Sequence, residues 1–165
     1  MPKPFIRQLT VNDAASFREL RLAGLQEAPE AFGSSYSAEK DHTVEDFAAT
    51  ITRNYLSGAF VVDQLIGVVG FYQSTGEKRS HRGNIWGVYV DPTHRGAGVA
   101  RALMENVLAH AKGIVSQVHL SVVTDNEAAL GLYKRLGFVS YGIEPRALRI
   151  GTRFCDEHMM VCLIA

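Results

Sequence analysis

The sequence has too few cysteines for an extensive framework of disulfide bonds, and it is also poor in tryptophan. There are 2 cysteines, Cys155 and Cys162, and 1 tryptophan among 165 residues. Two thiols in a chain without an export signal are typical of buried cysteines in a cytoplasmic protein. We therefore expect a cytoplasmic protein whose fold does not depend on disulfides.

An excess of charge and a long hydrophobic run are also missing. Lys and Arg number 17 and are balanced by 17 Asp and Glu, so the chain has no general affinity for polyanions and we expect no nucleic-acid partner. No apolar run reaches the length of about 20 residues that a membrane helix needs, and we expect no membrane partner. The opening stretch MPKPFIRQLT lacks the apolar segment of a signal peptide. The length favours one domain spanning residues 1–165.

The hydrophobic pattern predicts alternating strands and helices along the whole chain. Apolar residues at helical spacing favour one helix capped by Asn12 or Thr10 and another that begins at a Thr43–Asp46 capping box. A second capping box, Thr124 with Glu127, is expected to start the last helix, and Gly137 to end it. The predicted strands are 4–10, a hairpin over 59–73 broken at Asp63–Gln64, 83–90, 114–123, 138–150 and 153–164; the predicted helices end near 28, 56, 111 and 136.

This order predicts an α+β (mixed α/β) fold built on one central, mostly antiparallel sheet. The helix over 97–111 is a crossover, so the fourth and fifth strands, which flank it, should form a parallel pair. Helices are expected on both faces of the sheet.

The stretch VDPTHRGAGVARALM, which begins at Val90, places glycines where a helix begins. Such a turn exposes unpaired N–H groups and a partial positive charge, and glycine lets an anion come close. A P-loop is excluded because no Lys-Ser/Thr pair follows. The dinucleotide fingerprint fits poorly because Arg101 occupies its third small position. The pattern R-x-x-G-x-G/A, met by Arg95, Gly98 and Ala100, fits best, and a plain glycine-rich helix start is the structural alternative.

Two stretches together resemble the GNAT superfamily of acetyl-coenzyme A-dependent N-acetyltransferases. The first is WGVYVDPTHRGAGVARALM and the second is LSVVTDNEAALGLYKRLGF, and the resemblance is sharp over about residues 84–139. The second stretch carries the spacing N-x-x-A-x-x-x-Y-x-x-x-G-F, met by Asn126, Ala129, Tyr133, Gly137 and Phe138. The resemblance implies a GNAT-like fold and a direct transfer of an acetyl group from acetyl-CoA to a primary amine.

The resemblance also implies which residues bind the cofactor. Backbone groups of Val88, Tyr89 and Val90 should pair with the pantetheine arm as an added strand does. A backbone N–H near a bulge in that strand should polarise the thioester carbonyl. Asn126 should hydrogen-bond the same arm. The residues expected around the pyrophosphate, mostly through backbone N–H groups, are Arg95, Gly96, Ala97, Gly98, Val99, Ala100 and Arg101.

Tyr133 is the candidate general acid, because a phenol stays protonated at neutral pH and can donate to the departing thiolate. The alternative is a packing tyrosine on an amphipathic helix. The general base is less well marked: Glu30, His119 and backbone carbonyls are candidates, or the amine arrives neutral. Glu30 and Tyr36 are predicted to face the acceptor, since the corresponding segment of related proteins lines the acceptor side.

The run CDEHM over 155–159 suggests metal ligands at first sight, but strand alternation divides its side chains between two faces and no second ligand pair follows. We expect no metal. The expected partner is a small-molecule or peptide amine, and a homodimer joined through the last strands is compatible with the sequence. Two other hypotheses stay open: a non-catalytic acyl-CoA-binding or sensing module on the same fold, and a nucleotide-binding domain.

Overall fold

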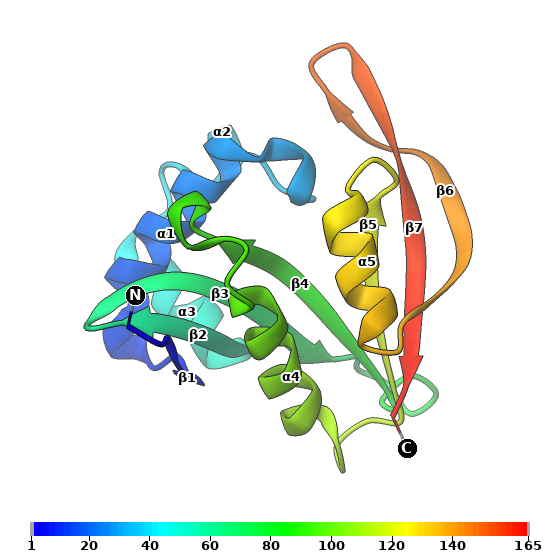
Figure 1. Ribbon diagram of the computed structural model, residues 1–165, viewed down its shortest axis with the longest axis horizontal. Helices are drawn as coiled ribbons and strands as arrows, with labels where there is room; N and C mark the ends of the chain where they lie inside the picture. Colours follow the sequence, from blue (N-terminus) through cyan, green and yellow to red (C-terminus); the bar gives the residue numbers. More distant parts are fainter. Residues whose placement is uncertain (1, 165) are drawn as a thin grey trace. The chain divides into compact units, whose positions relative to one another are not determined.

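The computed structural model describes residues 2–164 and contains the predicted succession of strands and helices (Figure 1). Its strands are β1 (Phe5–Gln8), β2 (Tyr55–Val61), β3 (Gln64–Gln73), β4 (Arg82–Val90), β5 (Gln117–Val123), β6 (Val139–Ile150) and β7 (Arg153–Leu163). Its α-helices are α1 (Ala14–Glu27), α2 (Tyr36–Glu39), α3 (Val44–Arg53), α4 (Val99–Ala111) and α5 (Glu127–Arg135). Short 3-10 turns η1 (Val11–Asp13), η2 (Pro29–Ala31) and η3 (Pro92–His94) join them. The helix α2 was not predicted.

The strands form one mixed sheet in the order β1-β2-β3-β4-β5-β7-β6. Antiparallel pairing joins β1 to β2, β2 to β3, β5 to β7 and β6 to β7. The parallel pair is β4 with β5, where Arg82, Gly83 and Asn84 lie opposite Gln117, Val118 and His119. The fold is therefore the predicted α+β arrangement, with α4 as the crossover between its two parallel strands.

Local hydrogen bonds decide where two of the helices begin. The sequence predicted a capping box at each of these two helix starts, and the structure contains one of them. The Thr43–Asp46 box is confirmed: the Asp46 N–H donates to Oγ1 of Thr43 over 3.2 Å, and the Thr43 N–H donates to Oδ2 of Asp46 over 2.8 Å. The Thr124–Glu127 box is wrong. Helix α5 begins at Glu127, and Asn126 is its N-cap, with Oδ1 accepting from the N–H of Ala129 over 3.1 Å. An Asn side chain next to the helix reaches that N–H directly, so Thr124 is not needed.

The boundary between α3 and β2 also differs from the prediction. The helix ends at Arg53, and Tyr55 and Leu56 belong to the strand, opposite Phe71 and Gly70 of β3. Asn54 has extended backbone angles (φ −127°, ψ 162°), and its side-chain amide donates to the carbonyl of Thr50 over 2.8 Å. Ladder pairing with β3 therefore takes these two apolar residues out of the helix that their spacing favoured.

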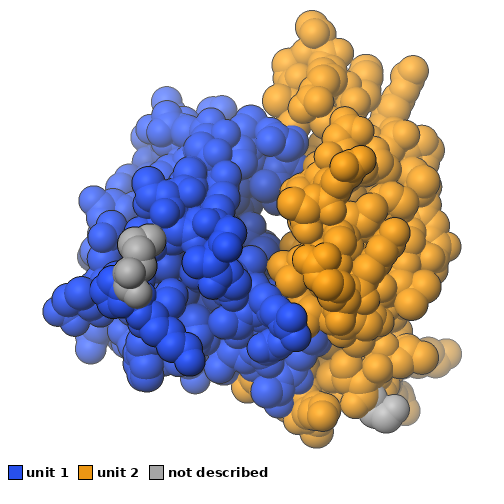
Figure 2. All heavy atoms as spheres, in the orientation of Figure 1, with its two compact units in different colours: residues 1–72, 86–109 blue, residues 73–85, 110–165 orange. Residues whose placement is uncertain are grey.

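The chain divides into two compact units, coloured blue and orange in Figure 2. Unit 1 comprises residues 1–72 and 86–109, and unit 2 comprises residues 73–85 and 110–165. Each unit is built from two separate segments, and β4 contributes its first residues to unit 2 and its last residues to unit 1. Of the helices in the described part of the chain, none is long and apolar enough to cross a membrane.

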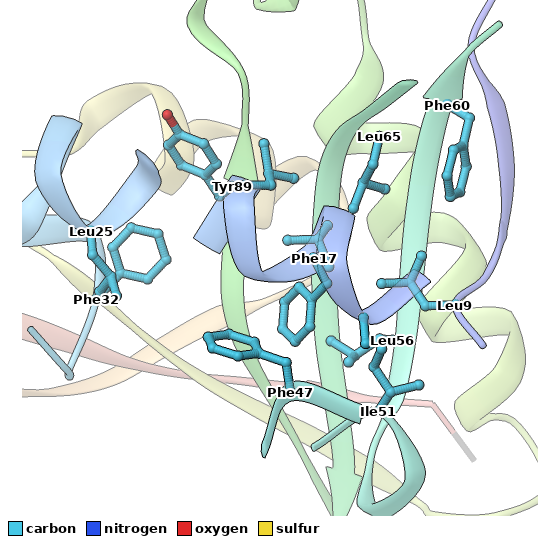
Figure 3. Packing of buried hydrophobic residues seen from close by; sticks show 13 residues of the cluster. Leu9, Phe17, Leu25, Phe32, Phe47, Ile51, Leu56, Phe60, Leu65 and Tyr89 are labelled. Atoms are coloured by element: carbon cyan, nitrogen blue, oxygen red, sulfur yellow. The ribbon is translucent and has the colours of Figure 1, made fainter. Parts of the chain in front are cut away.

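Unit 1 has its core between its strands and the helices α1 and α3. Figure 3 shows the rings of Phe17 from α1 and Phe47 from α3 meeting edge to face, with centroids 5.3 Å apart. Leu56, at 1% exposed, packs below them from β2. Helix α4 packs on the other face of these strands: a Cβ built on Gly67 would lie 3.0 Å from the side chain of Leu103. The last residues of β4 are thus fixed between two helical layers within this unit.

Unit 2 has its core on one face of β5 and β7. Val118 and Met160 are completely buried, and Leu120 lies directly opposite Met160 in the antiparallel register. Phe138, at 2% exposed, packs against Tyr133 of α5 with ring centroids 6.0 Å apart. Gly137 ends the helix with φ +100°, a left-handed conformation that glycine adopts without steric cost.

Candidate active site

The turn after β4 is shaped by a proline and two left-handed glycines. Pro92 begins the 3-10 turn η3, and Asp91 caps it by accepting from the Thr93 N–H over 2.9 Å. Gly96 has φ +78° and Gly98 has φ +80°, while a Cβ on either would meet nothing within 4 Å. The glycines are therefore required by backbone conformation and not by crowding from the protein, and the space beside them is open.

The backbone N–H groups of this turn are largely unpaired. In the described residues, the backbone bonds that fix the turn run from Arg95 N to Pro92 O (3.4 Å) and from Ala102 N to Gly98 O (3.0 Å). No hydrogen bond is formed by the N–H groups of Gly96, Ala97, Gly98, Val99 or Ala100 to any described residue. These donors stand at the start of the 13-residue helix α4, whose dipole adds a partial positive charge. The arrangement suits a phosphate or pyrophosphate group.

Arg95 uses its guanidinium to hold this turn in place. Its Nε donates to the carbonyl of Val90 over 2.9 Å, and its Nη2 donates to Oε2 of Glu27 over 2.7 Å. The Tyr89 hydroxyl donates to the same Glu27 oxygen over 3.0 Å. The Arg95 hydrogen bond lowers the pKa of Glu27, and burial together with Glu27 raises the pKa of Tyr89 to about 12. With the guanidinium engaged in this way, backbone N–H groups are left as the donors for a phosphate.

Ala100 and Arg101 differ in how they contribute to the helix start. Ala100 lies partly buried in the first turn of α4, whereas Arg101 is exposed and donates from Nε to Oε1 of Glu105 over 2.8 Å. That pair is a surface i,i+4 contact, which leaves the Arg101 side chain free to reorient at small cost. The structure therefore places a movable cation next to the unpaired N–H groups.

Strand β4 carries a kink at Gly87, whose φ of +64° interrupts the extended backbone. Regular alternation would place Trp86 and Tyr89 on opposite faces of the sheet. Both instead belong to the face covered by α1: Trp86 packs on the unit 1 core, and Tyr89 lies against Gly24 of α1. A backbone kink of this kind re-aims N–H groups next to a site, as bulges commonly do. The kink lies in the strand that is expected to bind the thioester, and the N–H contact expected there stays a prediction.

A pocket of about 500 Å³ opens in unit 1 between α1, α2, α3 and β4. Its walls combine aromatic rings, which come from Phe17, Phe47 and Trp86, with polar side chains from the helices. The lining residues are Phe17, Arg21, Ser34, Ala38, Glu39, His42, Asp46, Phe47, Thr50, Asn54 and Trp86. A cavity of this size that combines aromatic walls with convergent polar groups suits a small-molecule ligand.

Arg21 and Glu39 form an ion pair on the wall of this pocket. Nε and Nη2 of Arg21 donate to Oε1 and Oε2 of Glu39 over 3.0 and 2.8 Å, and Arg21 is only 8% exposed. Its guanidinium also stacks on the rings of Phe32 and Trp86, at 4.9 and 5.4 Å from their centroids. Burial opposes ionisation of Glu39, but hydrogen bonds from Arg21 and Ser34 outweigh it and lower its pKa. Glu39 is therefore a carboxylate at neutral pH.

The sequence-predicted acceptor residues lie near this pocket in the chain but do not line it. Glu30 is partly buried in η2, and Tyr36, 36% exposed, is the first residue of α2. Their proposed role stays a prediction. The residues that sequence reasoning missed are Arg21 and Glu39, and a signal for one of them existed. Arg21 falls four positions after Phe17, on the apolar side of α1, where a cation needs a buried partner.

Unit 2 carries Tyr133, the predicted general acid. The residue is 5% exposed on α5, and burial raises the pKa of its phenol well above the usual value. Among the described residues none accepts a hydrogen bond from this hydroxyl. The phenol is therefore protonated at neutral pH and keeps its donor available. Its packing against Phe138 fixes the ring, so the structural alternative and the catalytic role are compatible.

Asn126 and His119 have local partners in the same unit. The Asn126 side-chain oxygen caps α5, which leaves its amide N–H₂ group as the part that could bind a pantetheine arm. His119 lies 2.8 Å from Nε2 of Gln117 and 3.5 Å from Nη2 of Arg82. Burial, followed by the positive charge of Arg82, lowers the pKa of His119, so this imidazole is neutral at pH 7. No group of three or more potential metal ligands is found in the described residues.

The α+β fold, with unpaired N–H groups in the turn between a kinked central strand and α4, is of a class suited to phosphate-bearing ligands, and comparison with known proteins identifies the family. Residues 22–138 match the model of the acetyltransferase (GNAT) family, and this chain belongs to that family. Over 129 residues the chain is 30% identical to the L-amino acid N-acyltransferase MnaT of Escherichia coli (strain K12), covering 75% of this chain and 72% of that protein. It is 35% identical over 97 residues to the N-alpha-acetyltransferase RimI of Mycobacterium tuberculosis, covering 59% of this chain and 60% of that protein.

Solved structures agree with this assignment. The acetyltransferase of the GNAT family from Streptococcus pneumoniae superimposes with a TM-score of 0.86 at 25% identity, covering 99% of this chain and 100% of that chain. The acetyltransferase yncA of Salmonella typhimurium, solved with its cofactor acetyl-CoA, has the same fold, with a TM-score of 0.85 at 18% identity over 99% of this chain and 95% of that one. The chain spans only part of the length of some curated relatives: the match covers 25% of an uncharacterized Mycobacterium leprae protein and 60% of RimI.

Proposed function

We propose that this protein transfers an acetyl group from acetyl-CoA directly to a primary amine. The observation that carries the proposal is the turn over residues 95–100, whose unpaired N–H groups lie open at the start of α4. Membership of the acetyltransferase (GNAT) family makes the CoA pyrophosphate the anion that best suits this turn. The backbone of Val88–Val90 would pair with the pantetheine arm, and the kink at Gly87 would direct an N–H toward the thioester carbonyl.

In the proposed reaction the amine nitrogen attacks the thioester carbonyl and the carbon–sulfur bond breaks. The amine loses one proton, and the departing CoA sulfur gains one, so no other reactant is needed. Tyr133 would donate a hydrogen bond to the developing thiolate. Because its pKa is raised and the CoA thiol should resemble cysteine at about 8.5, complete proton transfer from the phenol is uphill. Tyr133 then acts chiefly by stabilising charge on sulfur, and the amine supplies the proton that sulfur finally carries.

The pocket between α1, α2, α3 and β4 is the proposed acceptor site. Its lining includes Trp86, and this residue directly precedes the kink at Gly87 and the strand assigned to the pantetheine arm. The name of MnaT describes N-acylation of an L-amino acid, and that of RimI describes N-alpha-acetylation. We propose the same chemistry here, with an α-amine as the nucleophile.

Glu39, the buried carboxylate of the pocket, is not suited to be its general base. Glu39 has a lowered pKa and is tied to Arg21 through both oxygens, so it is a poor proton acceptor. An α-amine has an ordinary pKa of about 7.7 to 8.0, much closer to neutrality than a lysine amine at about 10.4. A substantial fraction of an α-amine therefore arrives already neutral, which agrees with an acceptor site without a dedicated base.

Thermal unfolding with and without acetyl-CoA tests the cofactor part of the proposal. Acetyl-CoA and CoA should both raise the melting temperature because they bind the native state, whereas ATP and NAD at the same concentrations should not. Thiol release in the presence of α-amines then tests transfer. Binding of CoA without thiol release from any amine would favour the acyl-CoA-binding or sensing module, and no shift with either CoA compound would contradict the proposal altogether.

A further inference from the structure

Arg21 has one donor group that the pocket leaves unused. Nε and Nη2 are engaged by Glu39, while Nη1 makes no hydrogen bond with any described residue. A Cβ built on Gly87 would lie 3.2 Å from Nη1, so the missing side chain at this position keeps the donor open beside the kink of β4. The guanidinium is 8% exposed and lines the pocket, so a partner for this nitrogen comes from the pocket itself, as water or as a bound ligand.

The charges around Arg21 indicate what kind of partner is suitable. Glu39 neutralises the guanidinium at hydrogen-bond distance, and Asp46 contributes a second carboxylate to the lining. Arg21, Glu39 and Asp46 together carry a formal charge of −1, from one guanidinium and two carboxylates. A free carboxylate entering this pocket would meet no net positive charge and would repel Glu39. An uncharged carbonyl oxygen would accept from Nη1 without either penalty.

Resting on the proposed function, we propose that Arg21 and Glu39 select the acceptor by the charge of the group next to its amine. The acceptor is an α-amino amide, in which an uncharged carbonyl accepts from Nη1 of Arg21, and not a free α-amino acid. The aromatic walls formed by Phe17, Phe47 and Trp86 receive an apolar side chain.

The acceptors L-phenylalaninamide and L-phenylalanine differ only in this group and make the direct test. The wild-type protein should use the amide with kcat/KM about tenfold or more above that for the free acid. Because the two amines also differ in basicity, the decisive quantity is how this ratio changes in Glu39→Gln. Removing the carboxylate leaves the Arg21 charge uncompensated while preserving the side-chain shape, so the ratio should fall by about tenfold toward the free acid. Basicity of the amines cancels in this comparison.

Glu45→Gln is the matched control, because Glu45 is an exposed glutamate of α3 that does not line the pocket. This variant removes the same charge and should keep the wild-type ratio. A wild-type preference for the free acid, or a ratio that is the same in Glu39→Gln as in the wild type, overturns the proposal. The tripeptide Phe-Gly-Gly distinguishes the two sources of such an amide. Acetylation of the tripeptide would show that the acceptors are peptide N-termini. Acetylation of phenylalaninamide alone would show that they are small-molecule amides.

Binding of the two acceptors to the CoA-saturated protein, measured by calorimetry, separates this inference from the proposed function. If no amine is acetylated but the amide still binds about tenfold more tightly than the acid, the transfer reaction is disproved and the selection by Arg21 and Glu39 holds. If acetylation occurs but the acid binds as tightly as the amide, the transfer reaction holds and the selection by Arg21 and Glu39 is disproved. Unfolding curves of Glu39→Gln and wild type show whether the variant is folded at the assay temperature.

Discussion

At the scale of single residues, the site depends on side chains whose environment decides what they can do. Burial raises the pKa of Tyr133 further above neutrality, and Glu39 stays ionised in a buried position because Arg21 holds it. Arg95 belongs to the glycine-rich pattern of the sequence, and its guanidinium binds Glu27 and the Val90 carbonyl. The chemistry available to each residue therefore follows from its partners more than from its type.

Replacing Tyr133 by Phe should lower kcat by about a hundredfold and leave the KM for acetyl-CoA nearly unchanged. The change removes one hydroxyl that should act on the developing thiolate and not on bound acetyl-CoA. Steady-state kinetics with a fixed amine measures both parameters. Tyr72→Phe, at a half-exposed tyrosine of β3, is the control and should behave as wild type. Equal turnover in Tyr133→Phe and wild type would exclude Tyr133 as the donor.

The Glu27→Gln variant should bind acetyl-CoA about three- to tenfold more weakly than the wild type. A neutral amide in place of the carboxylate would hold Arg95 less firmly, so the turn that carries the free N–H groups would lose part of its support. The Arg95–Glu27 pair is 45% and 39% exposed, which keeps the expected effect small. Glu105→Gln removes a glutamate from the other exposed ion pair of this region, that with Arg101, and serves as the control in a calorimetric titration. A larger loss in Glu105→Gln than in Glu27→Gln would contradict the anchoring role of Arg95.

At the scale of the elements, β4, α4 and the short turn between them carry the residues proposed to bind the cofactor. The kink at Gly87 changes which β4 side chains face α1, and the left-handed Gly96 and Gly98 turn the chain into α4 with its first N–H groups unpaired. Val99 at the helix start is 4% exposed, so the helix is fixed to the core while the turn before it stays open. Rigid support under an open turn is the arrangement that preorganised anion binding requires.

Replacing Gly98 by Ala should destabilise the protein by about 1 kcal/mol, because an L-residue at φ +80° is strained even where space is available. The melting-temperature increase produced by acetyl-CoA should also become smaller, since relief of the strain moves the N–H groups. Gly33→Ala is the matched control: a Cβ there also meets nothing within 4 Å, and its φ is not left-handed. A ligand-induced shift that survives unchanged in Gly98→Ala would show that the turn does not bind the cofactor.

At the scale of the whole molecule, carboxylates dominate the dependence of stability on pH. Their pKa values are lowered by local partners at Asp13, Glu27, Glu39, Asp46 and Asp91. A carboxyl group whose folded pKa lies below its unfolded value stabilises the fold above about pH 4 and loses this contribution as the pH falls through the folded pKa. Glu157 has the opposite sign, because burial and Glu144 raise its pKa. Acid should therefore unfold the protein, with the loss beginning near pH 4.

The Asp13→Asn variant tests this sign at one position. Asp13 accepts from both Nη atoms of Arg7 and from the Thr10 N–H, and its side chain is 12% exposed. The variant should be less stable than wild type by about 1 kcal/mol at pH 7, and the difference should vanish as the pH falls toward 2. Chemical unfolding at several pH values measures it, with Asp41→Asn, at an exposed aspartate, as the control. A difference that grows in acid would mean that the sign is wrong.

The sequence by itself determined the order of the elements, the parallel pair around α4, the glycine turn and the family. These features are local or periodic: a helix start, a capping box or a left-handed glycine leaves its mark within a few residues. The turn residues from Arg95 to Arg101 could be named for the same reason, and their role toward the pyrophosphate stays a prediction. The errors were local too, at Thr124 and at the end of α3, where a competing side chain or strand pairing replaced the expected hydrogen bonds.

Only the tertiary structure decided which residues line the proposed acceptor pocket. The pocket joins residues of α1, α2, α3 and β4 that are far apart in the chain, and no local pattern records their approach. Arg21 meets Glu39 across 18 positions, and Trp86 meets Asn54 across 32, so both contacts depend on how the helices pack on the strands. The kink at Gly87 likewise changes which face Tyr89 occupies, and this is invisible to a pattern that assumes strict alternation. Helix starts and turns depend on neighbouring residues and could be predicted from the sequence, whereas the proposed acceptor pocket depends on packing between distant segments.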